Sequence, residues 1–394
     1  MMDVLYLAWR YLAYRRIKTA LLITAVTVIV YLPAGLNLLV DQSARQLRAR
    51  AATTPLLVGA KGSPLELVLS SLYFESNAPP SSYYAQLARV NQSRLALGIP
   101  LYVRFRAQGR TIVGTSLEYF AFRRLRIDRG RQFGMLGECV IGAEFAEQTD
   151  LHPGDSLLST PEGVFNIAGV YPLRMHVVGV LETTGSPDDL AIFVDIKTAW
   201  VMEGLAHGHQ DLTQPAAAGG ILRKEGNEII ANASVVQYNE ITRENVDSFH
   251  FHGDAAEFPL TSVIAVPKDE KSSALLAGRY LSGDKPVQLV RPDRVMSELL
   301  DTILTIRRFI TFAVLLLGVA TVATIVLVFM LSFQLRRREM DTMIKIGGTR
   351  LRLVSLVGVE ILGVLIVGVF IAGTLTLLTS WLASAATRWL VQTI

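Results

Sequence analysis

The residues with the clearest chemical potential in this sequence are two closely spaced pairs of histidines. One pair reads His-Gly-His, the other reads His-Phe-His, and an aspartate follows soon after: His207, His209, His250, His252 and Asp254. Imidazole nitrogens and carboxylate oxygens are usual ligands of zinc. Both pairs lie in glycine-containing sequence that we expect to be loop, where solvated histidines without a function are also common. The sequence therefore leaves two interpretations, a zinc site or free surface histidines.

Other site chemistry finds little support. The stretch VGAKGS (58–63) places glycine and lysine near a serine, but its spacing is not that of a phosphate-binding P-loop. Cys139, the single cysteine, precedes a run of β-branched residues, which is typical of a buried position. We find no nucleophile set and no sign of nucleic-acid binding. We expect no enzyme activity and, apart from zinc, no cofactor bound by this chain.

Long apolar runs place the histidines between membrane spans. The chain is 51% hydrophobic, and a helix needs about 20 apolar residues to cross a bilayer. The runs predict three spanning helices, at 19–40, 309–333 and 353–378. Residues 41–305 are then a large water-soluble domain between the first and second spans.

Basic residues orient these spans. Arginine and lysine gather just before the first span, within residues 1–18, and in the short loop 334–352 between the second and third spans. Short loops rich in these residues stay in the cytoplasm. We therefore predict a multi-pass protein of the bacterial inner membrane, with residues 41–305 in the periplasm. A chain with one cysteine, which forms no internal disulfide, suits that compartment.

The ends of the chain predict elements that lie on the membrane surface. Residues 1–18 carry Trp9 and Tyr11 among arginines, which is typical of an amphipathic helix at the cytoplasmic surface. The tail 379–394 contains two tryptophans and one charge, so we expect an interfacial or periplasmic helix that follows the third span and contacts membrane lipid.

The outer domain reads as a mixture of short strands and helices. Helices at 41–52 and 293–306 should continue outward from the first and second spans. Five short runs are rich in β-branched residues and are separated by Gly, Pro and Asp, which predicts strands. These runs lie at 111–116, 138–142, 164–170, 175–182 and 191–196.

The cytoplasmic loop is the most distinctive segment. A basic, helix-prone stretch ends at Gly347-Gly348, and a second helix starts at Thr349. Glu360 lies near the inner end of the third span, where an ionisable group is costly and usually has a partner. An ordinary basic loop with a glycine cap would look similar, so charge alone does not assign a role.

The loop nevertheless resembles a known family. RRREMDTMIKIGGTRLRLVSLVGVE is similar to the cytoplasmic coupling segment of FtsX/MacB-type ABC transporter permeases, the type VII or mechanotransmission class that includes LolC. The outer-domain phrases TIVGTSLEYF, ECVIGAEFAEQTDLHPGDSL, VVGVLETTG and FVDIKTAW resemble MacB-like periplasmic domains in order and spacing. The resemblance covers nearly the whole chain. The loop positions that match the pattern are Arg338, Glu339, Lys345, Gly347, Gly348, Thr349 and Glu360.

The resemblance implies a membrane α-helical bundle with a large α/β periplasmic domain inserted after the first span. It implies a permease subunit that couples ATP hydrolysis, by two copies of a separate ATPase subunit, to movements of that domain. ATP and magnesium would be bound by the ATPase. A second permease copy or a paralogue would complete the complex, with a periplasmic adaptor or substrate-binding protein as a further partner. The ATPase would dock on 334–352, with charged contacts from Arg336, Arg337, Arg338 and Glu339.

One departure and two alternatives follow. Members of the family usually have four spans, whereas this sequence has three. The histidine pairs are not part of the family phrases, so they leave open a zinc-linked ABC transporter. A permease that regulates a periplasmic partner without transporting anything, as FtsX does, is the other alternative.

Overall fold

The computed structural model describes residues 2–75, 81–160, 172–208, 221–225, 228–231, 238–281, 286–335, 342, 345 and 350–393. The chain forms two compact units. The first comprises Met1–Ala49 and Ser297–Ile394, and the second comprises Arg50–Met296.

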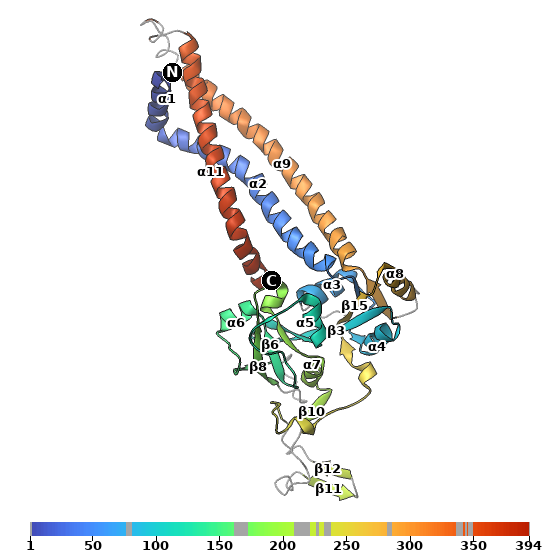
Figure 1. The fold of residues 1–394 in the computed structure, drawn as a ribbon. Helices are drawn as coiled ribbons and strands as arrows, with labels where there is room; N and C mark the ends of the chain where they lie inside the picture. The colour runs from blue at the N-terminus through green and yellow to red at the C-terminus, as the bar shows by residue number, and fades with distance from the viewer. Residues whose placement is uncertain are drawn as a thin grey trace. The chain divides into compact units, whose positions relative to one another are not determined.

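The first unit is built from long helices (Figure 1). They are α1 (Met2–Tyr14), α2 (Arg16–Ala52), α9 (Pro292–Leu335) and α11 (Arg350–Thr393). In the described part of the chain, three of them are long and apolar enough to cross a membrane: α2, α9 from Pro292 to Leu331, and α11 from Val354 to Leu382. Both α2 and α9 run without a break across the boundary between the two units.

The C-terminal helix differs from the sequence-based expectation. The sequence analysis divided this region into a span that ends at residue 378 and a separate helix from 379, but α11 continues through this point to Thr393. The reason is local: the stretch Thr379–Thr387 is polar but contains neither glycine nor proline, so nothing in it ends a helix.

Few side chains pack between the long helices, and many apolar ones face outward. Leu22 and Val26 of α2 pack with Phe329 of α9 and Val364 of α11. The hydroxyl of Thr27 donates to the carbonyl of Gly368 at 3.2 Å. Phe309 and Phe370 are among the large apolar side chains that remain exposed, which suits helices surrounded by lipid.

The second unit is organised around one mixed sheet of ten strands (Figure 1). Nine of them follow the order β16-β1-β15-β3-β4-β9-β6-β8-β5, and β7 pairs with β8. The β4–β9 and β6–β8 pairs are parallel, and the other pairs in this sheet are antiparallel. The strands are β1 (Leu56–Ala60), β3 (Ala96–Ala107), β4 (Arg110–Thr115), β5 (Ile127–Gly130), β6 (Glu138–Ile141), β7 (Ser156–Leu158), β8 (Arg174–Leu181), β9 (Ile192–Asp195), β15 (Ser262–Pro267) and β16 (Val287–Val290).

Short helices and three small strand pairs complete this unit. The helices are α3 (Pro64–Tyr73), α4 (Ala85–Gln92), α5 (Leu117–Arg123), α6 (Ala143–Thr149), α7 (Ile196–Glu203), α8 (Glu270–Arg279) and the 3-10 turns η1 (Pro187–Leu190), η3 (Val246–Ser248) and η4 (Ala255–Glu257). The pairs are β2 (Ser82–Tyr83) with β14 (Pro259–Leu260), β10 (Ala206–Gly208) with β13 (Phe249–Phe251), and β11 (Ile221–Glu225) with β12 (Glu228–Ala231).

Local sequence explains several of these boundaries. The hydroxyl of Ser63 accepts from the backbone N–H of Glu66 at 3.3 Å, and Pro64 occupies the first turn of α3. The carboxylate of Asp269 accepts from the backbone N–H of Ser272 at 2.7 Å and starts α8 in the same way. Such caps satisfy backbone donors that have no partner inside the helix.

The core of the second unit is dominated by aromatic rings and β-branched side chains. Phe193 of β9 lies 5.6 Å from Tyr119 and 5.5 Å from Phe120, measured between ring centroids. Every residue of β6 is buried, including Cys139. Its burial confirms the sequence-based prediction and raises the pKa of the thiol above its ordinary value.

Four of the five predicted strands are confirmed, as β4, β6, β8 and β9. The fifth, 164–170, lies outside the described residues. The prediction of loop around the histidine pairs is wrong, because β10 and β13 form there. Strands of three residues carry too few positions for an alternating pattern to be recognised.

Candidate functional site

The structure brings three of the predicted histidines together. Strand β10 pairs antiparallel with β13, and His207 lies directly opposite His250. The ring centroids of His207 and His250 are 4.9 Å apart, and that of His252 is 4.7 Å from each of the other two. One ring nitrogen from each of the three lies within 4.8 Å of the others. We call His207, His250 and His252 the histidine cluster.

Packing on the other side of β13 explains how this cluster is presented. Side chains alternate between the two faces of a strand, so Phe251 points away from the histidines on either side of it. Its ring lies 6.4 Å from that of Trp200 on α7 and 6.0 Å from that of Phe258. The half-buried aromatic ring therefore fixes the strand, and the two flanking histidines are exposed.

The other two predicted metal ligands are not part of the described cluster. The carboxylate of Asp254 accepts from the backbone N–H of Ala256 at 2.9 Å and caps η4. It does not belong to the group of converging ligand atoms. His209 lies outside the described residues. The structure thus supports three of the five predicted positions as one group.

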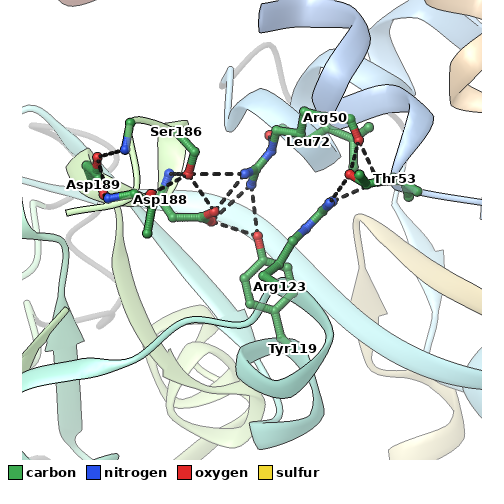
Figure 2. A network of polar contacts seen from close by, with 11 residues as sticks. Arg50, Thr53, Leu72, Tyr119, Arg123, Ser186, Asp188 and Asp189 are labelled. Carbon is green, nitrogen blue, oxygen red and sulfur yellow. Dashed lines mark hydrogen bonds and ion pairs between the residues drawn. The ribbon is translucent and has the colours of Figure 1, made fainter. Parts of the chain in front are cut away.

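A second polar cluster lies at the end of α2 and was not predicted from the sequence (Figure 2). The guanidinium of Arg50 donates to both carboxylate oxygens of Asp188, at 2.6 and 2.9 Å, and to the hydroxyl of Tyr119 at 2.9 Å. It also donates to the backbone carbonyl of Leu72. The hydroxyl of Tyr119 donates to Asp188 at 2.8 Å. We call Arg50, Tyr119 and Asp188 the arginine network.

The arginine network contains a buried ion pair. Burial alone would raise the pKa of the Asp188 carboxyl, but the adjacent Arg50 guanidinium and the hydroxyl of Tyr119 hold that pKa below its ordinary value. Arg123 flanks the network and donates to the hydroxyls of Thr53 and Thr54, at 3.2 and 2.8 Å. These contacts join the last turn of α2 to α5 and η1 within the second unit.

The turn that carries Asp188 is itself fixed by hydrogen bonds. The neighbouring carboxylate of Asp189 accepts from the backbone N–H groups of Thr184 and Gly185, at 2.9 and 2.7 Å. The hydroxyl of Ser186 caps the turn by accepting from the backbone N–H of Asp188 at 3.2 Å. No sequence signal could have revealed the network, because Arg50 and Asp188 are 138 positions apart.

The predicted ATPase-coupling residues are only partly described. Arg336, Arg337, Arg338, Glu339, Gly347, Gly348 and Thr349 lie outside the described residues. Lys345 is helical and exposed. Glu360 is 2% exposed and lies on α11 one turn before Val364, which packs against α2 and α9. A coupling role for these positions stays a prediction.

Comparison with known proteins identifies the family of the chain. A family model described as the MacB-like periplasmic core domain matches residues 19–241, which is more than half of the chain. The match therefore includes His207 but ends before His250 and His252. No curated protein matches the chain.

Two solved structures are similar to parts of it. The periplasmic region of MacB from Actinobacillus actinomycetemcomitans has 11% sequence identity over 62% of this chain and 92% of that chain, with a TM-score of 0.33. The extracellular domain of the noncanonic ABC-type transporter YknZ from Gram-positive bacteria has 13% identity over 60% of this chain and 98% of that chain, with a TM-score of 0.31. By its family match, this chain belongs to the proteins with a MacB-like periplasmic core domain, the FtsX/MacB-type ABC transporter permeases.

Proposed function

We propose that this chain is a permease subunit through which a separate ATPase subunit moves a domain outside the membrane. Membership of the FtsX/MacB-type family is the observation that carries the proposal. The complex would contain two ATPase subunits and a second permease copy or a paralogue. It would reside in a bacterial inner membrane, with the N-terminus and 334–352 in the cytoplasm and residues 41–305 in the periplasm.

The path of α2 supports a mechanical role. This helix runs without a break from Arg16 to Ala52, and its apolar part precedes a last turn that is tied into the second unit by Arg50. Pro33 removes one backbone hydrogen bond inside this helix, but no loop interrupts it. No flexible linker separates the apolar part of α2 from Arg50. A displacement of α2 in the membrane would therefore be passed on to Asp188 and Tyr119. Helix α9 also crosses the unit boundary unbroken.

The test of this proposal uses the full chain, reconstituted with its ATPase subunit in lipid nanodiscs. A spin label at Lys271→Cys, an exposed position on α8, would report the distance between two permease copies. Cys139 is buried and would stay unlabelled. We expect this distance to change when ATP is added, and the change to disappear in Arg338→Ala and Glu339→Ala while the ATPase still hydrolyses ATP.

Arg129→Ala is the matched control, since it removes an exposed arginine of the outer domain. It should leave the ATP-dependent change in distance intact. An unchanged response in both cytoplasmic variants would contradict the proposed role of 334–352. If ATP does not change the distance between the labels in the wild-type complex, the proposed relay is wrong.

A further inference from the structure

We propose that His207, His250 and His252 bind one divalent transition-metal ion, with zinc as the best-suited ion, in an open site on the second unit. The proposal rests on the geometry of the histidine cluster. It does not depend on the coupling of this chain to ATP hydrolysis, so either proposal can fail without the other.

Strand pairing places all three rings on the same face. His207 and His250 are direct partners across the β10–β13 pair, where opposite side chains are close neighbours. His252 is two residues beyond His250 and so returns to the same face. Its backbone N–H donates to the carbonyl of Leu205 at 2.9 Å, which extends the antiparallel register by one more pair. The backbone therefore directs three imidazoles toward one point.

The distances within the cluster suit a tetrahedral ion. Zinc binds imidazole nitrogen at about 2.0–2.1 Å, which places two nitrogens on one ion about 3.4 Å apart. One nitrogen from each ring already lies within 4.8 Å of the other two. Rotation about the side-chain torsions can shorten these distances, because His250 and His252 are exposed and His207 is half-buried.

One hydrogen bond prepares His250 as a ligand. Its Nδ1 lies 3.1 Å from the backbone carbonyl of Ser248, and a carbonyl can only accept. Nδ1 therefore carries the hydrogen, and the lone pair of the neutral ring is on Nε2. A backbone carbonyl that fixes the tautomer in this way is the usual outer partner of a metal-bound histidine.

Folding alone does not account for three histidines here. The alternation of β13 needs Phe251 inward, but any polar residue would serve at the exposed positions on either side. The family match ends at residue 241, so it does not account for His250 and His252 either.

The ligand set also indicates the class of metal. Imidazole without thiolate suits zinc, copper and nickel, whereas calcium and magnesium prefer oxygen ligands. The carboxylates of Glu203 and Asp254 are engaged elsewhere: Glu203 pairs with Arg104 at 2.7 Å, and Asp254 caps η4. Three protein ligands on an exposed surface leave a fourth position for water or for a group from another molecule.

The test is calorimetric titration of zinc chloride into the full-length protein in detergent, after the protein has been stripped of metal with a chelator. We expect one ion per chain with micromolar or tighter affinity. Loss of a group that only orients a metal ligand usually weakens binding about 10–100-fold, so loss of a ligand itself should cost at least as much. His250→Ala and His252→Ala should each show such a loss.

Two further histidines of the same unit provide matched controls. His152→Ala and His176→Ala remove imidazoles that lie outside the cluster and should leave zinc binding unchanged. Cobalt substitution adds a readout of geometry, because a tetrahedral cobalt site absorbs visible light strongly and an octahedral one does not. Thermal unfolding without metal verifies that each variant is folded, and glutamine replaces alanine in any variant that is not.

Three results would overturn the proposal. Zinc affinity that is unchanged in both cluster variants would place the ion elsewhere. An equal loss in the control variants would indicate non-specific binding to histidines. The absence of binding to the folded wild-type protein would leave the cluster as three solvated side chains.

Discussion

The second unit holds two polar clusters that differ in what surrounds them. The arginine network is buried, and the guanidinium of Arg50 forms an ion pair with the carboxylate of Asp188, with a nitrogen–oxygen distance of 2.6 Å. Among the described residues, the histidine cluster consists of imidazoles alone and lies near the surface. A buried charge pair that is complete in itself leaves no bonding capacity for a ligand. A group of three imidazoles that converge near the surface can still take a metal ion, which is why we assign a structural role to the first cluster and propose binding for the second.

Removing the charge of Asp188 should have the largest effect on stability, and it tests whether the arginine network has a structural role. Asp188→Asn has nearly the same shape but leaves the buried Arg50 without its counter-charge. Breaking a buried ion pair on one side usually costs about 3–5 kcal/mol. We expect the free energy of unfolding of the second unit to fall by that amount. The measurement is denaturant titration of the full-length protein with Trp9, Trp381 and Trp389 replaced by Phe, so that Trp200 alone reports by fluorescence.

A comparison with an exposed ion pair gives the control. Asp128 pairs with Arg129 at the surface, where about half of each side chain is exposed, so Asp128→Asn should cost less than about 1 kcal/mol. Equal losses in the two variants would mean that burial does not distinguish these pairs and that the arginine network is not a special anchor of α2.

Acid should weaken the arginine network in a defined direction. The folded-state pKa of Asp188 lies below its ordinary value of about 3.9, so the folded state binds fewer protons than the unfolded state. The stabilisation is complete above pH 4 or so and is lost as pH falls through the folded-state pKa. The difference in stability between wild type and Asp188→Asn should therefore shrink below about pH 4. A difference that stays constant down to pH 2 would contradict the pairing.

Zinc binding should also distinguish the two clusters, because only the histidine cluster is expected to bind the ion. A ligand present at 100 times its dissociation constant stabilises a folded protein by about 2.7 kcal/mol. We expect zinc to raise the unfolding temperature of wild type and of Asp188→Asn, but not of the His207/His250/His252→Ala variant. Without metal, this triple variant should unfold within about 1.5 kcal/mol of wild type, about 0.5 kcal/mol for each substitution, because His250 and His252 are exposed and His207 is half-buried.

Asp254→Asn sharpens the assignment of the ligands. The sequence analysis included Asp254 in the metal site, whereas the structure uses its side chain to cap η4. Asparagine caps a helix about as well as aspartate. Zinc affinity should therefore be unchanged in this variant, and a tenfold loss would return Asp254 to the ligand set.

A smaller effect should come from Gly142, which packs against the turn that carries Asp188. A Cβ at this position would lie 2.3 Å from the backbone carbonyl of Asp189 and 2.4 Å from that of Asp188. Gly142→Ala must push the turn away, at a cost of about 1–3 kcal/mol in the free energy of unfolding. Gly278→Ala, on α8 with no atom within 4 Å of its Cβ, should be neutral or slightly stabilising.

The sequence predicts what depends on neighbouring residues and misses what depends on distant ones. The strands around Val113, Val140 and Phe193 follow from runs of β-branched and aromatic residues, and the start of α3 follows from Ser63-Pro64. The spacing of His250 and His252 places both on one face once β13 forms, but the sequence itself predicted a loop there. Which strand meets which, and hence the closeness of His207 to His250, depends on folding that no local pattern encodes.

The arginine network illustrates the same limit more sharply. Arg50 lies in a sequence that reads as an exposed, charged helix, and three of its neighbours between residues 41 and 52 are also charged. Its burial is decided by Asp188 and Tyr119, which come from elements far along the chain. The family resemblance, by contrast, was found in the order of several phrases over the whole chain, and the match over residues 19–241 confirms it.

The burial of Cys139 has a practical consequence for every experiment on motion. The chain contains one cysteine, and its thiol is enclosed in β6. In the folded protein, a cysteine introduced at an exposed position would thus be the only thiol that a maleimide or methanethiosulfonate reagent can reach. Cross-linking and fluorescence labelling can therefore start from the natural sequence. Cys139 does not have to be replaced first, so the packing around it stays unchanged.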